Sequence, residues 1–226
     1  MFKKVVFQTN KLKSLQRFYA NVLELDVLDR TEQHFTVKIG TTDVTFQQTE
    51  KNAQYHFAIN IPGNQFVIMK YWIQDRLTLN KNGGLNEIYY SSFDADSMYF
   101  EDPAGNLIEL IGRRHKDLFG SLTKEAFFNV SEVALISKNV SEIGEALQDF
   151  GIPLRHGSEV NPKGVNFLGQ GDTFIVLAPS KWKWYFSNNK ARTYPVEITL
   201  NDERKIISDA KGNVELRVKK ETTKEN

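Results

Sequence analysis

Hydrophobic and polar positions repeat along the chain in units that each begin with a strand-like segment. In the first unit, the apolar run 5–7 predicts a short buried strand, and apolar residues at helical spacing over 12–23 predict a helix. Residues 25–28 lead into a strand, the alternation at 35–39 predicts another, and a turn joins it to a returning strand at 44–48. The unit therefore has the order strand, helix and three strands.

The same order begins again at three later points. Strands are predicted at 56–61, 132–136 and 196–200. A helix-like segment follows the first two of these, whereas the last unit has almost no room for a helix. Repeats of about 50 residues are typical of supersecondary units that bury one another's apolar faces. The sequence therefore predicts an α+β fold built from tandem βαβββ modules.

Two turns with the spacing Asp-x-x-Gly-Asn support a division of the four units into pairs. They lie at 102–106 and 209–213, in the second and fourth units. We expect one domain over residues 1–112, a linker over 113–130 and a second, degenerate domain over 131–220. The second half is expected to act as a packing partner rather than as a second active site.

Composition and charge exclude several classes of function. A formal net charge of +1 gives no electrostatic case for binding nucleic acid or an anionic membrane. The chain contains no cysteine, which excludes disulfides, thiolate metal sites and a cysteine nucleophile. No apolar run approaches the ~18 residues of a membrane-spanning helix, and the N-terminus turns polar too soon for a signal peptide. We expect a cytoplasmic protein.

Two motifs resemble a known family. Residues 15–25, with Phe18-Tyr19 and Val22-Leu23, are similar to the first helix of the vicinal oxygen chelate superfamily, and 99–110 (YFEDPAGNLIEL) are similar to its closing hairpin. This superfamily includes glyoxalases, bleomycin resistance proteins and extradiol dioxygenases. The resemblance covers 1–112 well and 131–218 only weakly. It implies curled mixed sheets in two glyoxalase-like domains, with a divalent metal held inside a cup formed by two units.

Within this resemblance, His56 and Glu109 occupy the positions of metal ligands. Strand alternation places Glu109 on the face opposite the helix layer, and it places Asn60 on the same face as His56. An imidazole and a carboxylate suit iron, manganese, zinc or nickel. Glu109 is also the candidate catalytic residue, and Asn60 is expected to line the cup and bind substrate.

The first unit departs from the family pattern. Lys4 stands where the family has its first-strand histidine, and an ammonium group has no lone pair for a metal. Gln8 lies on the same strand face, and either Gln47 or Gln48 replaces the carboxylate of the unit's last strand. We expect Lys4, Gln8 and Gln47 to bind substrate. One alternative has no metal, with Lys4 binding an anionic substrate beside Glu109.

Two further segments allow more than one interpretation. Trp182, Trp184 and Phe186 alternate with Lys183 and Tyr185, which predicts a strand with one aromatic face. That face could be the packing surface between the two halves or a stacking wall for an aromatic ligand. The charged run 113–116 is expected to be solvated linker.

The sequence therefore indicates a metal-dependent enzyme, of the lyase or ring-cleavage dioxygenase type, that acts on a small molecule with vicinal oxygens. The metal would polarise a substrate oxygen as a Lewis acid. The alternative is a non-catalytic protein that sequesters a small molecule on the same fold, as bleomycin resistance proteins do. We expect a monomer or a homodimer.

Overall fold

The computed structural model describes residues 1–120, 122, 124–157 and 159–218, so positions 219 and 220 of the expected second domain lie outside it. The helices are α1 (Leu12–Arg17), α2 (Phe66–Gln74) and α3 (Val140–Asp149). The strands are β1 (Phe2–Thr9), β2 (Val27–Arg30), β3 (His34–Ile39), β4 (Thr42–Gln48), β5 (His56–Pro62), β6 (Ile88–Tyr90), β7 (Ala95–Glu101), β8 (Leu107–Arg113), β9 (Asn129–Ser137), β10 (Asn166–Gln170), β11 (Thr173–Pro179), β12 (Val196–Leu200), β13 (Lys205–Ser208) and β14 (Val214–Arg217). None of the described helices is both long and apolar enough to cross a membrane.

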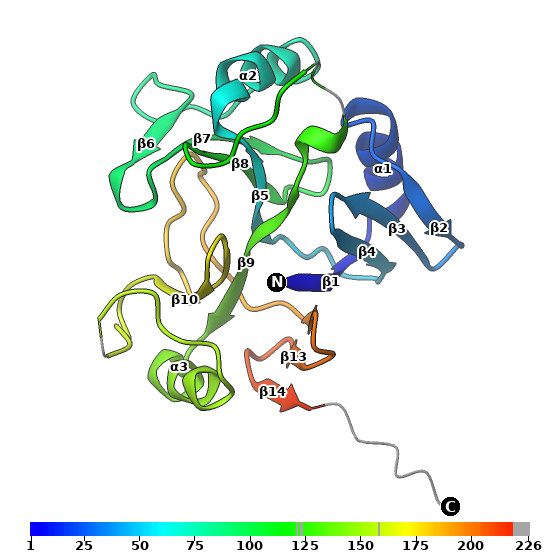
Figure 1. Cartoon of the computed structure of the whole chain (residues 1–226). Coiled ribbons are helices and arrows are strands. Elements are labelled where there is room, and N and C mark those ends of the chain that lie inside the picture. The colour runs from blue at the N-terminus through cyan, green and yellow to red at the C-terminus, as the bar shows by residue number, and fades with distance from the viewer. Residues whose placement is uncertain (121, 123, 158, 219–226) are drawn as a thin grey trace, which may run out of the picture.

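The strands form two seven-stranded mixed sheets (Figure 1). Sheet A has the order β14-β13-β12-β1-β4-β3-β2, and sheet B has the order β10-β11-β9-β5-β8-β7-β6. The predicted α+β class with curled mixed sheets is confirmed. The fourth unit contains β12, β13 and β14 but no helix among its described residues.

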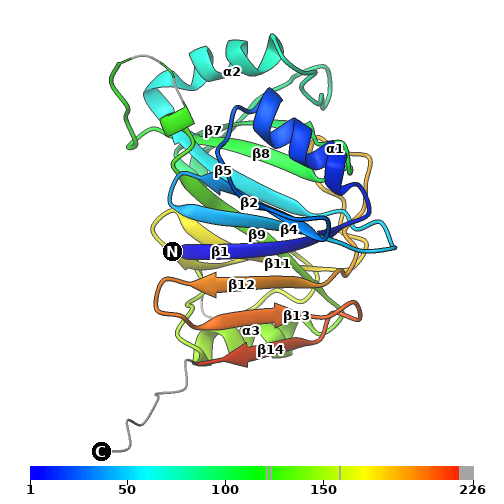
Figure 2. The same cartoon turned by 90° about the vertical axis from the view of Figure 1, so that its right-hand side faces the viewer.

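The units pair in a different way from the expected one. The first and second units do not share a sheet. Instead, β1 of the first unit pairs with β12 of the fourth, and β5 of the second pairs with β9 of the third. Figure 2 shows β1 beside the C-terminal strands, although almost the whole chain separates them in sequence. Strand β9 runs antiparallel along the edge of β5 that β8 leaves free.

One hydrophobic core joins the two sheets. Phe7 of β1 stacks against Phe57 of β5 with ring centroids 5.1 Å apart, and both side chains are fully buried. Leu15 of α1, Ile73 of α2 and Leu147 of α3 belong to the same core. Because side chains alternate along a strand, the neighbours of the core residues in sheet B face away from sheet A. That outer face of sheet B, which we call the site face, carries the candidate chemistry.

The turn between β7 and β8 is held by a buried carboxylate. Asp102 accepts hydrogen bonds from Tyr19 Oη (2.9 Å), Asn106 Nδ2 (2.7 Å) and the backbone N–H of Ala104 (2.9 Å). Burial raises the pKa of Asp102 to about 6, and these hydrogen bonds oppose the shift. The turn fixes how β7 and β8 pair, and thereby which side chains of β7 face Glu109.

The turn between β3 and β4 leads to a stability prediction. Gly40 has a φ of +53°, and a Cβ at this position would lie 2.0 Å from the carbonyl oxygen of Phe128. Gly40→Ala is expected to destabilise the protein by about 2–3 kcal/mol, as measured by urea denaturation. Gly83 has a similar φ of +59°, but no described atom lies within 4 Å of the place that its Cβ would occupy. Equal losses for Gly40→Ala and Gly83→Ala would show that the close approach to Phe128 costs nothing.

Candidate functional site

Three adjacent strands of sheet B bring one imidazole and two carboxylates together. His56 lies on β5, Glu109 on β8 and Glu132 on β9. Ala58, two residues after His56, pairs with Glu109 on one side and with Glu132 on the other. Side chains two residues apart share a strand face, so all three groups project from the site face. Ile108 and Leu110, which flank Glu109, belong to the core instead.

The three side chains are within reach of a single ion. His56 Nε2 lies 3.7 Å from Glu109 Oε2, and each residue offers a ligand atom within 4.8 Å of the other two. None of the three is more than 6% exposed. His56 Nδ1 lies 3.1 Å from the carbonyl oxygen of Leu107, which can only accept a hydrogen bond. The proton therefore sits on Nδ1, and the lone pair of Nε2 faces the carboxylates.

Burial shifts the protonation of all three groups. It raises the pKa of Glu132 to about 8, and the nearby Glu109 carboxylate adds to this shift. Burial also raises the pKa of Glu109, and it lowers the pKa of His56 to about 4. Glu132 therefore keeps a proton at neutral pH, beside a Glu109 carboxyl group that burial also makes harder to ionise. A cation that displaced this proton would meet a neutral imidazole and two carboxylates.

A buried arginine lies behind the cluster. Arg113 ends β8 and is 2% exposed. Its Nη2 donates a hydrogen bond to Ser131 Oγ (2.9 Å) and lies 3.6 Å from Glu132 Oε1, while its Nε lies 3.9 Å from Asp172 Oδ1. The expectation that 113–116 is solvated linker is therefore wrong for Arg113, because β8 continues through it. Its positive charge favours the ionised forms of Glu109 and Glu132.

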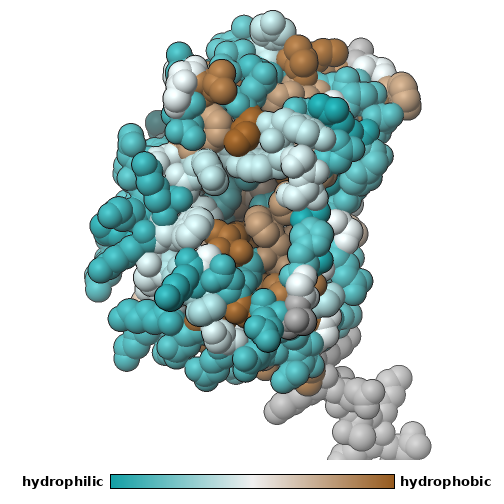
Figure 3. All heavy atoms as spheres, turned by 90° about the vertical axis from the view of Figure 1, so that its left-hand side faces the viewer, coloured by the Kyte–Doolittle hydropathy of each residue, from teal (hydrophilic) through white to brown (hydrophobic). Residues whose placement is uncertain are grey.

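Beside the three groups is a cavity of about 230 Å³ with mostly apolar walls. Its aromatic lining consists of Tyr90, Phe93, Tyr99, Phe167, Trp182, Trp184 and Tyr185. The Trp184 ring lies 4.6 Å from the His56 ring, centroid to centroid. Figure 3 shows this side of the molecule, where hydrophobic side chains lie in a hollow surrounded by polar ones. A cavity with one polar end and aromatic walls suits a small, flat ligand.

The aromatic segment 182–186 is a loop and not the predicted strand. It lies between β11 and β12, and its one ladder contact is an isolated bridge between Lys183 and Lys190. Trp182 and Trp184 line the cavity and also pack against Ala134 and Ile136 of β9. Contacts between the two halves come from Trp184, beside His56, and from Phe186, which stacks on Tyr99. A role in stacking on an aromatic ligand stays a prediction.

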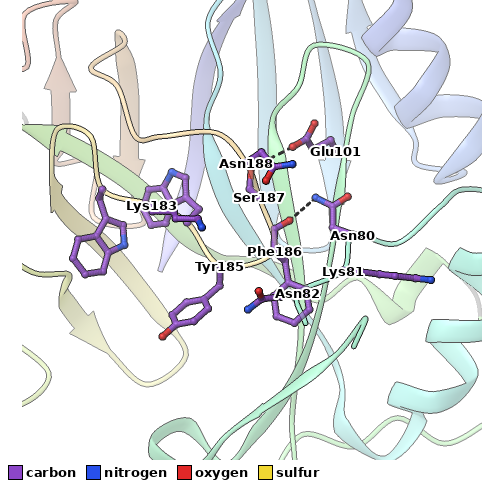
Figure 4. A pocket seen from close by; sticks show the side chains of 11 residues that line it. Asn80, Lys81, Asn82, Glu101, Lys183, Tyr185, Phe186, Ser187 and Asn188 are labelled. Atoms are coloured by element: carbon purple, nitrogen blue, oxygen red, sulfur yellow. Dashed lines mark hydrogen bonds between the residues drawn. The ribbon is translucent and has the colours of Figure 1, made fainter. Parts of the chain in front are cut away.

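A second cavity, of about 590 Å³, is also lined by this loop (Figure 4). Several of its polar groups are already paired with one another. Asn80 Nδ2 donates to the carbonyl oxygen of Phe186 (2.7 Å), and Ser187 Oγ donates to Glu101 (3.3 Å). His56, Glu109 and Glu132 do not line it, so the candidate chemistry belongs to the smaller cavity.

Comparisons with known proteins give the same fold. The family model of the toxoflavin-degrading enzyme matches residues 130–181. A glyoxalase I variant from Zea mays superposes with a TM-score of 0.57 at 14% identity, over 95% of this chain and 92% of that one. A candidate dioxygenase from Bacillus subtilis superposes with a TM-score of 0.58 at 16% identity, over 78% of this chain. The chain has the vicinal oxygen chelate fold.

Two further facts bear on these comparisons. The matched region covers 63% of the Bacillus subtilis protein. No curated protein matches the sequence. At identities this low the likeness establishes the vicinal oxygen chelate fold, while the chemistry must be argued from the residues themselves.

Within the vicinal oxygen chelate fold, the predicted site residues separate into two groups. His56 and Glu109 converge on the site face of sheet B, whereas Lys4, Gln8 and Gln47 lie on sheet A. Because the first unit pairs with the fourth, its strands do not share a cup with His56 and Glu109. Lys4 is exposed and cannot serve as a cation beside Glu109. Gln8 and Gln47 pair with each other across β1 and β4.

Asn60 lies on the same face as His56, as expected, but it does not line the cavity. Its Nδ2 donates to Asn129 Oδ1 (3.2 Å) and to the carbonyl oxygen of Asp172 (3.1 Å). The residue missed from the sequence is Glu132. Its signal was a carboxylate within the otherwise apolar strand that opens the third unit.

The strand registers identify the counterparts of the cluster in sheet A. Val6 pairs with Thr45 and with Glu197, as Ala58 pairs with Glu109 and with Glu132. Lys4, two residues before Val6, therefore takes the place of His56. Of the three counterparts, Glu197 is the carboxylate, and its Oε1 lies 2.6 Å from Lys205 Nζ. Lysine, threonine and an ion-paired glutamate do not make a metal site.

Proposed function

We propose that this protein is a metal-dependent enzyme that binds a small molecule with vicinal oxygens beside His56, Glu109 and Glu132. The observation that carries the proposal is the convergence of these three buried ligand groups within 4.8 Å of one another. All three, and the walls of the adjacent cavity, come from one chain. A second copy is therefore not needed to complete the site.

The chemistry of the three groups fits a divalent transition metal. One neutral imidazole and two carboxylates suit manganese, iron, nickel or zinc. The positive charge of Arg113 does not balance the negative charge of two ionised carboxylates. The pKa values of Glu109 and Glu132 remain raised although Arg113 lies beside them. A bound divalent cation would supply the missing positive charge and release the proton of Glu132. When bound, it would supply Lewis-acid polarisation of a substrate oxygen.

The chain's own residues would orient the substrate and exclude water. The Leu107 carbonyl holds the His56 ring, and Trp184 packs against that ring. Aromatic walls would stack against a flat ligand, while the described residues of the lining include no lysine or arginine that could bind a charged tail. This lining favours a ring-shaped substrate, and with it a ring-cleavage reaction, over a glutathione conjugate of the glyoxalase type. The family match to the toxoflavin-degrading enzyme includes Glu132 and agrees with a degradative role.

A calorimetric titration of EDTA-treated protein with Mn²⁺ tests the metal site. The wild type, purified without a metal-chelating column, is expected to bind one equivalent. Glu132→Gln is expected to weaken binding at least tenfold, because it replaces an anionic ligand with a neutral one. Glu197→Gln removes the equivalent carboxylate of sheet A and should leave the affinity unchanged. Binding by Glu132→Gln that equals the wild type would contradict the proposal.

Sequestration without chemistry is the second candidate. The observation in its favour is the apolar cavity, in which Glu132 keeps its proton at neutral pH in the absence of metal. Thermal-shift screens of aromatic compounds with Mn²⁺ and with EDTA separate the two functions. Ligands that stabilise only the Mn²⁺-loaded protein support the enzyme, and ligands that are equally effective in EDTA support sequestration.

A further inference from the structure

Two hydroxyl groups on β7 face the Glu109 carboxylate. Tyr99 is the cross-strand partner of Glu109, and Ser97 is the partner of Ile111, two residues further along β8. Residues opposite and diagonal on one face of a sheet lie within side-chain reach of one another. Both hydroxyls favour the ionised form of Glu109, against the effect of burial on its pKa.

The hydrogen bonds of the fold leave both hydroxyls with bonding capacity to spare. Ser97 is completely buried, and its Oγ makes no well-formed hydrogen bond to any described residue. A buried hydroxyl without such a bond is uncommon in a native protein and calls for a reason. Tyr99 is 3% exposed and lines the cavity, and its hydroxyl lies 2.8 Å from that of Tyr90. If Tyr90 donates this hydrogen bond, the proton of Tyr99 is free to point toward Glu109.

The phenol of Tyr99 is held rigidly in place. Its ring stacks on that of Phe186, with the centroids 4.8 Å apart and the planes 10° from parallel. Phe186 in turn packs with Trp184, which walls the cavity. Because this ring is fixed, its hydroxyl can set the orientation of a carboxylate. A hydroxyl on a mobile side chain would instead move with the carboxylate.

We propose that Ser97 and Tyr99 are positioning residues that hold the Glu109 carboxylate in the orientation required of a metal ligand. This inference rests on the proposed metal site. A carboxylate that gives one oxygen to a metal retains a second oxygen, and hydrogen bonds to that oxygen fix its rotation. The hydroxyl of Ser97, which lacks a good partner in the metal-free arrangement, gains one when Glu109 turns toward the ion. In this arrangement the Tyr99 hydroxyl donates to Glu109 and accepts a hydrogen bond from the Tyr90 hydroxyl, which lies 2.8 Å away.

Mn²⁺ affinity and the Co²⁺ absorption spectrum test this inference without any substrate. Tyr99→Phe and Ser97→Ala are each expected to weaken Mn²⁺ binding about 10–100-fold, as the loss of a hydrogen bond to a metal ligand usually does. The visible bands of the Co²⁺-loaded variants are expected to shift, because Glu109 takes up a different orientation. Tyr19→Phe is the matched control, since it removes another buried phenol hydroxyl that hydrogen bonds to a carboxylate, Asp102. The bonds from Asn106 and from the backbone N–H of Ala104 to Asp102 continue to hold the β7–β8 turn. Tyr19→Phe should leave both readouts as in the wild type.

The outcomes separate this inference from the proposed function. If Glu132→Gln loses Mn²⁺ affinity while Tyr99→Phe and Ser97→Ala bind as the wild type does, the positioning role is overturned and the metal site stands. If the wild type binds no Mn²⁺, both proposals fall. Should Tyr99→Phe not fold, Ser97→Ala decides the question by the same two readouts, because it removes only one small hydroxyl group.

Discussion

Replacing Arg113 with methionine is expected to destabilise the metal-free protein by about 3–5 kcal/mol. The guanidinium is almost completely buried between Glu132, at 3.6 Å, and Asp172, at 3.9 Å. Methionine fills much of the same space but leaves both carboxyl groups without their buried cation. It also removes the hydrogen bond from Arg113 to Ser131. Arg113→Lys should lose less, because the charge remains while the planar donor geometry is lost.

The neighbouring residue provides the control for this prediction. Arg114 is also ion-paired, with its Nε 3.8 Å from Asp94 and 3.6 Å from Asp96, but its side chain is 57% exposed. Exposed ion pairs contribute less than about 1 kcal/mol, so Arg114→Met should change stability little. Urea denaturation in EDTA measures both variants. Similar losses at the two positions would mean that burial of Arg113 has no special energetic consequence.

The sequence predicts local structure well where one period dominates. Alternation at 56–61 places His56 and the core residue Phe57 on opposite faces of β5, as the structure has them. The motif at 99–110 identifies the hairpin because its turn chemistry is specific: the Asp102 carboxylate bonds the backbone and side chain of Asn106. From these local signals the closeness of His56 and Glu109 also follows, since β5 and β8 are neighbours within one unit.

The pairing of units could not be predicted in this way. Whether β5 takes β1 or β9 as its second neighbour depends on contacts between segments remote in sequence, and both candidates contain apolar runs. This choice decides the third member of the cluster. It brings Glu132 to the site and removes Lys4 from it. The residues carried over from the first unit were therefore assigned to the wrong sheet, although the equivalence of Lys4 and His56 within their units agrees with the registers.

Arg113 and the aromatic loop were missed for a related reason. A charged run such as 113–116 is usually solvated, and only the continuation of β8 beside β5 buries its first member. Alternating aromatic residues usually indicate a strand, but 182–186 belongs to the connection from sheet B to sheet A. The backbone turns at both ends of this segment, where Lys181 and Phe186 have positive φ angles of 70° and 55°. Tertiary packing overrides the local pattern at both places.

The stability of the metal-free protein is expected to fall by about 1–2 kcal/mol between about pH 6.5 and about pH 8. Burial raises the pKa of Glu132 from its usual 4.5 to about 8, so the folded state keeps a proton that the unfolded state has lost. The corresponding stability is fully present below pH 4.5 and is lost as the pH rises through 8. His56 acts in the opposite sense, because its pKa falls from 6.5 to about 4 and the unfolded state alone takes up that proton. The histidine slope is half its maximum at pH 6.5 and fades within about one pH unit above that, so it offsets only a small part of the decline.

Urea midpoints at about pH 6.5, 7.2 and 8.0 in EDTA measure this decline, and two conditions should remove it. Glu132→Gln has no proton to lose, so its stability should stay nearly constant across the interval. Saturating Mn²⁺ should also flatten the profile, because a bound cation keeps the carboxyl groups ionised throughout and replaces the proton of Glu132. Glu197→Gln, which alters an ion-paired carboxylate of sheet A, should keep the wild-type slope. A decline that persists in Glu132→Gln would mean that another group carries this proton, and it would remove the electrostatic reason for a cation at this site.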